Sequence, residues 1–131
     1  VLAMDCEAVI LDEPTAGQDL YGIELLHNII AELHAQGKTV ITITHDIEFA
    51  AENFQRIVVM AHRQILKDGT PEEVFADEPV LNEAMLKGPC SGRLARRLNL
   101  HGEILTNEQF LDAFCRIYER GASNEVINKE E

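Results

Sequence analysis

Two adjacent carboxylates, Asp12 and Glu13, follow directly after the apolar run Ala8–Leu11, and Pro14 comes next. A buried strand gains nothing from two acids at its end, because an ionised carboxylate is costly to remove from water. At the carboxyl end of a strand, however, such groups lie where open α/β sheets bind ligands. Asp12 is therefore a candidate Mg²⁺ ligand, acting through water, and Glu13 a candidate general base that orients an attacking water. The alternative is a strand end whose acids only cap the following loop.

A third candidate side chain, His45, follows the β-branched run Thr39–Thr44. It is therefore also expected at the carboxyl end of a strand, one helix and one strand after Asp12. A loop histidine beside a bound nucleotide can donate a hydrogen bond to the γ-phosphate or stabilise charge during its transfer. The alternative reading of an isolated Thr-His-Asp triplet is a helix cap.

The elements that must position these side chains alternate between strand and helix. Apolar residues recur at helical spacing from Leu20 to Gln36, with Asp19 as N-cap and Gly37 as the C-terminal stop. A short helix is expected at Asp46–Asn53. Three further strands are expected in this half: Thr39–Thr44, Arg56–Ala61 and Gln64–Lys67. This alternation predicts an α/β domain with a parallel sheet.

After Gly69 the pattern is helical. Two helix starts, Thr70–Glu73 and Thr106–Gln109, combine a threonine cap with a Glu or Gln three residues later. Further helices are expected at Val80–Leu86 and Arg93–Leu98, separated by a linker over Lys87–Gly92, and residues 123–131 are expected to form a frayed acidic tail. The predicted architecture is an incomplete parallel sheet in residues 1–69, followed by a small helical subdomain in residues 70–131.

Composition and charge restrict the class of partner. The chain has 131 residues, 46% hydrophobic and 26% charged, which is typical of a globular domain with a real core. Its formal net charge of −12 argues against a nucleic-acid or anionic-membrane surface. The three cysteines lack metal-ligand spacing and are interpreted as reduced thiols of a cytosolic protein. One basic cluster is interpreted as a solvated helix face: Arg93, Arg96 and Arg97.

The string that runs from Ala8 through Asp12 and Glu13 resembles the Walker B segment of ABC-type ATPases, and His45 resembles their H-loop. The resemblance implies the P-loop NTPase fold of an ABC ATPase, with ATP and Mg²⁺ as cofactors. It implies that Asp12 binds Mg²⁺ through water, that Glu13 activates the attacking water, and that His45 contacts the γ-phosphate.

The following loop, Ala16–Asp19, is similar to the family's D-loop. By this resemblance Gly17 and Asp19 would serve the interface between two facing ATPase subunits. Gln18 departs from the apolar residue usual at its position, and we expect only a subtle effect.

Later segments indicate the type of ABC protein. Gly69–Phe75, after a short hairpin, is similar to importer-type ATPase subunits, and the segments Leu94–Leu98 and Leu105–Phe110 look like the C-terminal helices of energy-coupling-factor and cobalt-type ATPases. The resemblance implies a peripheral subunit at the cytoplasmic face of the cell membrane that couples ATP hydrolysis to uptake of a vitamin or metal ion. Its implied partners are a second ATPase subunit, identical or different, and transmembrane subunits, with no nucleic acid.

Two expected parts of such an ATPase are absent from the sequence. It holds no G-x-x-x-x-G-K-[ST] loop to cradle phosphates and no signature loop. Because the chain opens on Val1, directly in apolar sequence, we expect the C-terminal half of a longer ATPase that alone binds ATP weakly or not at all and does not hydrolyse it. Open sheet edges in such a half favour a rearranged or intermolecular sheet, and hence self-association. Two alternatives stay open: a non-catalytic subunit-interaction or dimerisation module, and a non-transport ABC ATPase.

Overall fold

The computed structural model describes residues 6–100, 102 and 104–127, with side chains as far as residue 117. The chain forms two compact units, residues 1–54 and 55–131. The β-hairpin after residue 54 therefore belongs to the second compact unit. The functional boundary expected between residues 69 and 70 stays a prediction.

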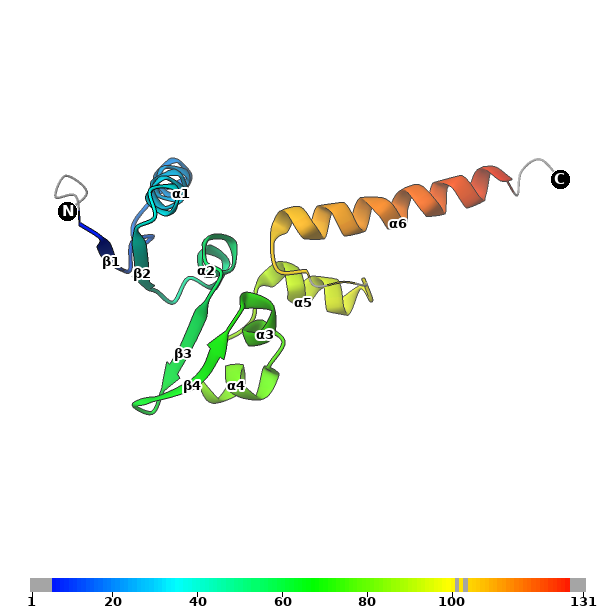
Figure 1. Cartoon of the computed structure of the whole chain (residues 1–131). Coiled ribbons are helices and arrows are strands. Elements are labelled where there is room, and N and C mark those ends of the chain that lie inside the picture. Colours follow the sequence, from blue (N-terminus) through cyan, green and yellow to red (C-terminus); the bar gives the residue numbers. More distant parts are fainter. Residues whose placement is uncertain (1–5, 101, 103, 128–131) are drawn as a thin grey trace. The chain divides into compact units, whose positions relative to one another are not determined.

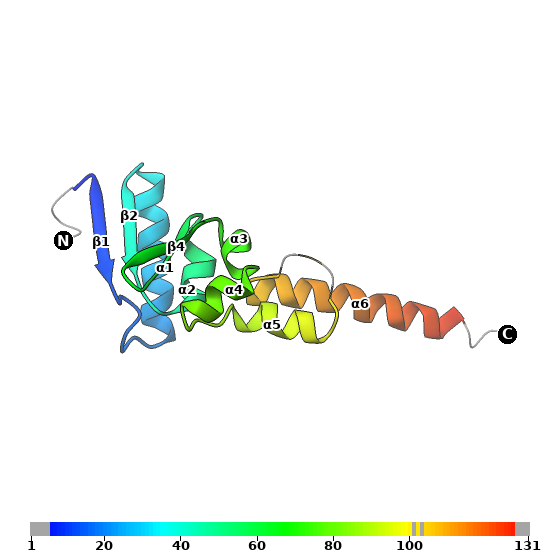
Figure 2. The same ribbon diagram turned by 90° about the horizontal axis from the view of Figure 1, so that it is seen from below.

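The first unit is built on two parallel strands, β1 (Ala8–Asp12) and β2 (Thr39–Ile43), joined through helix α1 (Leu20–Ala35) (Figure 1). Asp12 pairs with Ile43 at the carboxyl end of the register. Both strand arrows point the same way in Figure 2, beside α1. A parallel pair needs a crossover connection of this kind, and the helix supplies it.

The ends of α1 lie where the sequence predicts them. The Asp19 carboxylate accepts a hydrogen bond from the Gly22 amide at 2.8 Å, so Asp19 is the N-cap. At the other end Gly37 has a φ of 74°, a left-handed conformation that favours glycine. A second, shorter helix of this unit, α2 (Ile47–Asn53), begins after Asp46.

Alternation along the strands divides the small sheet into a covered and an uncovered face. Val9 is buried, and the core of the unit is completed by two residues of α1 and one of α2: Ile30, Leu33 and Phe49. The opposite face leaves Ile10, Ile41 and Ile43 about half exposed or more. Since successive strand residues point to opposite sides, one face packs under the helices and the other does not.

In the second unit, β3 (Ile57–Ala61) and β4 (Gln64–Gly69) form an antiparallel hairpin with a bulge between Val59 and Met60. Among the described residues β3 pairs only with β4, so the parallel sheet holds two strands. The turn residues His62 and Arg63 both have positive φ, as a tight two-residue hairpin turn requires.

The helices of this unit follow the hairpin: α3 (Pro71–Phe75), α4 (Glu78–Glu83), α5 (Cys90–Arg97) and α6 (Asn107–Ile127). Thr70 and Glu73 form the predicted capping box at α3. Gln109 and Thr106 exchange equivalent bonds at the start of α6. The helices enclose an apolar core: Val74, Phe75, Leu81, Ala95 and Ile104.

Three sequence predictions for this unit are wrong in their bounds. The helix expected at Val80–Leu86 spans Glu78–Glu83, because Asp77 caps it by accepting the Val80 amide and Pro79 suits its first turn. The helix expected at Arg93–Leu98 begins at Cys90, which shortens the predicted linker.

The tail expected from residue 123 is helical through Ile127, because α6 continues to that residue. Residues 128–131 of that predicted tail lie outside the described residues. No helix in the described part of the chain is both long and apolar enough to cross a bilayer.

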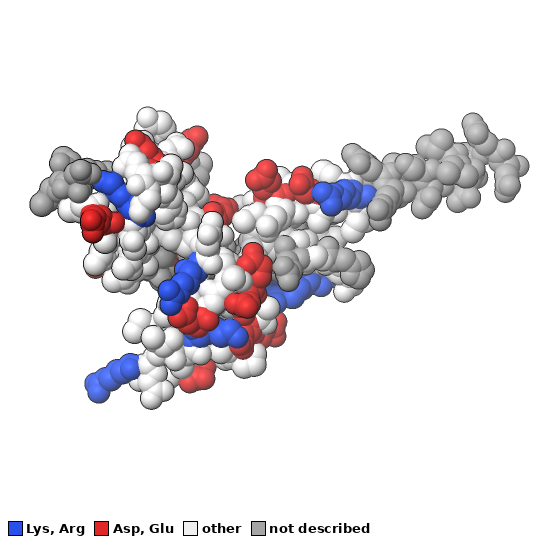
Figure 3. Space-filling model, viewed as in Figure 1, with Lys and Arg blue, Asp and Glu red and all other residues white. Residues whose placement is uncertain are grey.

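In the basic cluster predicted on α5, Arg96 Nη1 lies 3.5 Å from Glu78 Oε1. Arg93, Arg96 and Arg97 are all exposed, as expected of a solvated helix face. Figure 3 shows acidic and basic side chains intermixed on the face in view. Exposed pairs of this kind contribute little to stability.

Candidate functional site

The candidate site lies where β1 and β2 end side by side. The strands are parallel, so their carboxyl ends meet at the same edge of the sheet. The Glu13 amide donates to the Ile43 carbonyl at 2.8 Å, which extends the strand pairing one residue past Asp12. Residues 12–13 and 44–45 are thereby brought together from positions some thirty residues apart in the sequence, as the sequence predicts for the two strand ends.

Glu13 turns the chain sharply at this edge. Its φ of 45° is left-handed, which costs conformational free energy for a non-glycine residue. The Glu13 carbonyl accepts from the Ala16 amide at 3.1 Å, closing a turn around Pro14. The turn re-aims the Glu13 side chain toward the end of β2, whereas a continued strand would carry it along the sheet.

Glu13 and His45 are in direct contact. His45 Nδ1 lies 2.8 Å from Glu13 Oε2. The hydrogen bond to His45 holds the pKa of the Glu13 carboxyl below its usual range, and the same bond, with the negative charge of Glu13, raises the pKa of His45. The His45 side chain is 83% exposed and that of Glu13 37%, so solvent screens this ion pair.

A second contact to Glu13 comes from Thr44. Its hydroxyl donates to Glu13 Oε2 over 3.4 Å and accepts from the Asp46 amide at 3.0 Å. The Asp46 carboxylate in turn accepts from the Phe49 amide at 3.0 Å, as the N-cap of α2. The helix-cap interpretation of the Thr-His-Asp triplet is therefore confirmed for Asp46, while the role of His45 at a γ-phosphate stays a prediction.

Thr44 was not among the site residues predicted from the sequence. The available signal was a hydroxyl side chain at the last position of a β-branched run, directly before the histidine. Its contact with Glu13 depends on the strand register and on the turn at Glu13, neither of which the sequence pattern specifies.

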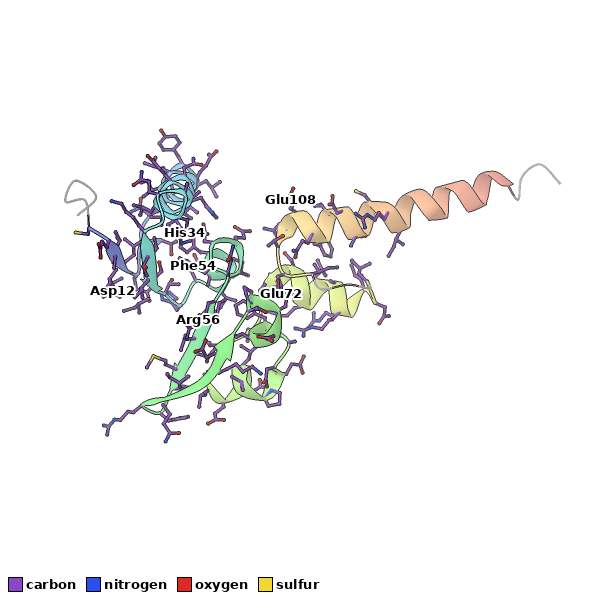
Figure 4. The ribbon with its side chains drawn as sticks, in the orientation of Figure 1. Asp12, His34, Phe54, Arg56, Glu72 and Glu108 are labelled. Carbon is purple, nitrogen blue, oxygen red and sulfur yellow. The ribbon has the colours of Figure 1, made fainter. Side chains whose placement is uncertain are left out.

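Asp12 is exposed at the end of β1, where Figure 4 labels it. Magnesium in nucleotide sites commonly takes one or two carboxylates and fills its other positions with water and phosphate oxygens. No group of three or more His, Cys, Asp and Glu side chains that could hold a metal is found among the described residues. A single exposed carboxylate such as Asp12 suits a metal ion of this hydrated kind, and its role as a Mg²⁺ ligand stays a prediction.

The two residues predicted for a subunit interface lie on the loop between β1 and α1. The Asp19 carboxylate is engaged as the cap of α1 through the Gly22 amide. Gly17 has a φ of 72°, and a Cβ at this position would meet no atom within 4 Å. Backbone conformation, not a close contact within the described chain, therefore explains the glycine. The interface role of both residues stays a prediction.

Comparisons with known proteins bear on the identity of this site. No protein-family model matches the chain. An energy-coupling factor transporter ATP-binding protein EcfA2 of Methanospirillum hungatei is 42% identical over 102 residues, which cover 78% of this chain and 26% of the relative. A protein of the same name from Mycoplasmopsis synoviae is 36% identical and aligns with 99% of this chain and 43% of its own length.

A solved structure agrees with these sequence relatives. CbiO1 of Clostridium perfringens, described as part of the ABC transporter complex CbiONQ, is 31% identical with a TM-score of 0.54. The match covers 75% of this chain and 38% of that protein. These homologues confirm the resemblance to ABC ATP-binding proteins of the energy-coupling-factor and cobalt type, and the α/β P-loop NTPase fold class. The chain spans about a quarter to two fifths of the length of these relatives.

Proposed function

Because its homologues are ATP-binding proteins of ABC transporters, we propose that this chain carries part of the catalytic site of an ATP-hydrolysing transporter subunit. The subunit couples hydrolysis to uptake of a vitamin or metal ion. The contact of Glu13 with His45 at the carboxyl ends of two parallel strands carries this proposal. A carboxylate and an imidazole at the edge where α/β sheets bind their ligands support the proposal.

Each residue of the site has a distinct role in this proposal. Glu13 orients the attacking water and accepts its proton. His45, exposed beside Glu13, donates a hydrogen bond to the γ-phosphate and stabilises the charge that develops there. Asp12 supplies a carboxylate to Mg²⁺ through water; the bound ion would neutralise charge on the phosphate oxygens.

The loop that follows is proposed to face a second ATPase subunit. Gly17 allows the left-handed turn that exposes this loop, and Asp19 begins α1 at its end. In the proposal these two residues lie in the contact between subunits. The further partners are transmembrane subunits, so the assembly lies at the cytoplasmic face of the membrane, with this chain peripheral to it.

The printed sequence contributes only part of a nucleotide site. It has no Gly-rich loop with Lys to cradle the phosphates. Phosphate binding is a large share of nucleotide affinity in such sites, because backbone N–H groups and the lysine neutralise the triphosphate. We therefore propose that the 131 residues alone bind ATP weakly or not at all and do not turn it over.

A non-catalytic interaction module is the second candidate, favoured by one observation. Helix α6 exposes a stripe of large apolar residues at helical spacing: Leu111, Phe114 and Ile117. Such a stripe suits burial against another chain. In this candidate the second unit supplies subunit contacts and the first unit is scaffold.

Turnover by the assembly that contains this chain distinguishes the two candidates. The assembly is purified through an affinity tag on this chain, and its ATPase rate is compared with that of Glu13→Gln. Loss of a positioned general base lowers the rate by about 10²- to 10⁴-fold. Glu24→Gln, an exposed change on α1, serves as the control with unchanged turnover. Equal rates for the unmodified chain and Glu13→Gln would support the interaction module instead.

A further inference from the structure

We propose that Thr44 is a positioning residue that holds the Glu13 carboxylate in place independently of His45. The inference rests on the proposed function, since it concerns the group assigned there as the base. The backbone of Glu13 has a left-handed φ of 45°, which persists only when the surroundings hold it. The amide of Glu13 is fixed by Ile43 and its carbonyl by Ala16, but these bonds leave the side chain free to rotate.

His45 is a poor anchor for that side chain. Its ring is 83% exposed, so it is itself held by few neighbours. An exposed ion pair gains little from its Coulomb attraction, because water screens the charges and two side chains lose rotational freedom.

Thr44 has the properties that His45 lacks. It is half-buried, and as a β-branched residue it has few allowed χ1 rotamers. Its hydroxyl donates to Glu13 Oε2 over 3.4 Å while it accepts from the Asp46 amide at 3.0 Å. One rotamer of one side chain thus satisfies both partners.

The anchor extends into the core of the unit. Asp46 caps α2 through the Phe49 amide, and Phe49 is 3% exposed. The chain of contacts runs from buried Phe49 through Asp46 and Thr44 to the Glu13 carboxylate. Glu13 is therefore tied to a packed helix, whatever His45 does. A hydroxyl that served only to close the turn before α2 would have no need of its bond to Glu13.

Nuclear magnetic resonance of the 131-residue chain without nucleotide tests this assignment. The readout is the shift difference between the two γ-methylene protons of Glu13, which collapses when the side chain rotates freely. Three variants are compared: Thr44→Val, which has nearly the same shape without the hydroxyl, Thr44→Ser, which restores it, and His45→Ala.

We expect the difference to survive in Thr44→Ser and His45→Ala and to be lost in Thr44→Val. Unchanged signals of Ile30 and Phe49 show that the unit stays folded. A difference retained in Thr44→Val would overturn the assignment. Loss of the shift difference in His45→Ala, where Thr44 is present, would also overturn the assignment. This second test can be made even if Thr44→Val does not fold. Since no nucleotide is present, either outcome is independent of the turnover experiment that tests the proposed function.

Discussion

His45 Nδ1 lies 2.8 Å from Glu13 Oε2, although the two residues are separated in the sequence by a helix and a strand. The contact exists because β1 and β2 are parallel and in a register that pairs Asp12 with Ile43. The residues that follow the two strands therefore lie at the same edge of the sheet. The relationship can be tested through the ionisation of the pair and through the elements that support it.

The pKa of His45 depends on Glu13. The contact raises it, so His45 keeps its proton to higher pH than an ordinary histidine, whose pKa is about 6.5. We expect Glu13→Gln to lower the pKa of His45 toward that value, because the substitution removes the charge and weakens the hydrogen bond. An NMR titration of the imidazole in metal-free buffer measures it. Glu24→Gln should leave the pKa of His45 unchanged; an equal fall in both variants would mean that net charge, not the contact, sets it.

The ion pair between Lys67 and Asp77 makes stability depend on pH at the acid end. Lys67 Nζ lies 2.9 Å from Asp77 Oδ2, and this bond, with that from the Val80 amide, lowers the pKa of Asp77. A carboxyl with a lowered folded pKa stabilises the fold above its unfolded pKa, and the contribution is lost as pH falls through the folded pKa. Asp77→Asn keeps a capping side chain but not the charge.

We therefore expect Asp77→Asn to have a lower Tm than the unmodified chain at neutral pH. The difference should shrink as both are acidified below the folded pKa of Asp77. Thermal unfolding followed by circular dichroism across this range measures it. A difference in Tm that stays constant over the whole range would contradict the charge contribution and point to the cap alone.

The capping box at α3 should contribute measurably to the second unit. Thr70 Oγ1 accepts from the Glu73 amide at 3.3 Å, and the Glu73 carboxylate accepts from the Thr70 amide at 3.0 Å. Thr70→Ala leaves a helix-terminal amide without its acceptor and should cost about 0.5–2 kcal/mol of unfolding free energy. Urea unfolding measures the loss, and Thr70→Ser, which keeps the hydroxyl, should recover most of it.

Two aliphatic residues of α1 should differ in their contribution to stability, because one is buried and the other is exposed. Ile30 is 1% exposed, whereas Leu25 is 49% exposed. Ile30→Ala should cost about 2–5 kcal/mol of unfolding free energy, because it removes buried methyl groups and leaves a cavity. Leu25→Ala should cost much less, since alanine is a good helix former and little buried area is lost. Similar losses for both in urea unfolding would show that Leu25 is covered in solution.

Nucleotide binding by the chain alone should be weak. Isothermal titration with Mg²⁺-ATP is expected to give no saturation in the micromolar range and no phosphate release. The reason is the missing phosphate-binding loop, as the Glu13–His45 site itself is formed. A micromolar dissociation constant, or steady hydrolysis that Glu13→Gln abolishes, would refute this expectation.

The sequence alone determined the local elements and the chemical types at the site. Apolar spacing predicts α1, the β-branched run predicts β2, and the Thr70–Glu73 pattern predicts the start of α3, because these features depend on residues a few positions apart. The carboxylates after β1 and the histidine after β2 could be identified for the same reason. The start of α4 was missed where Asp77 and Pro79 competed with the apolar pattern.

Only the tertiary structure decided which side chains of the site contact one another. The left-handed turn at Glu13, the 2.8 Å contact to His45 and the contribution of Thr44 all depend on the pairing of two strands far apart in the sequence. The pairing depends on which face of the strands is buried, with Val9 in the core and Ile10 exposed, and this is a cooperative choice that no local pattern encodes. The adjacent acids Asp12 and Glu13 thus indicate a site in the sequence, and the fold brings Glu13 into contact with Thr44 and His45, which follow β2.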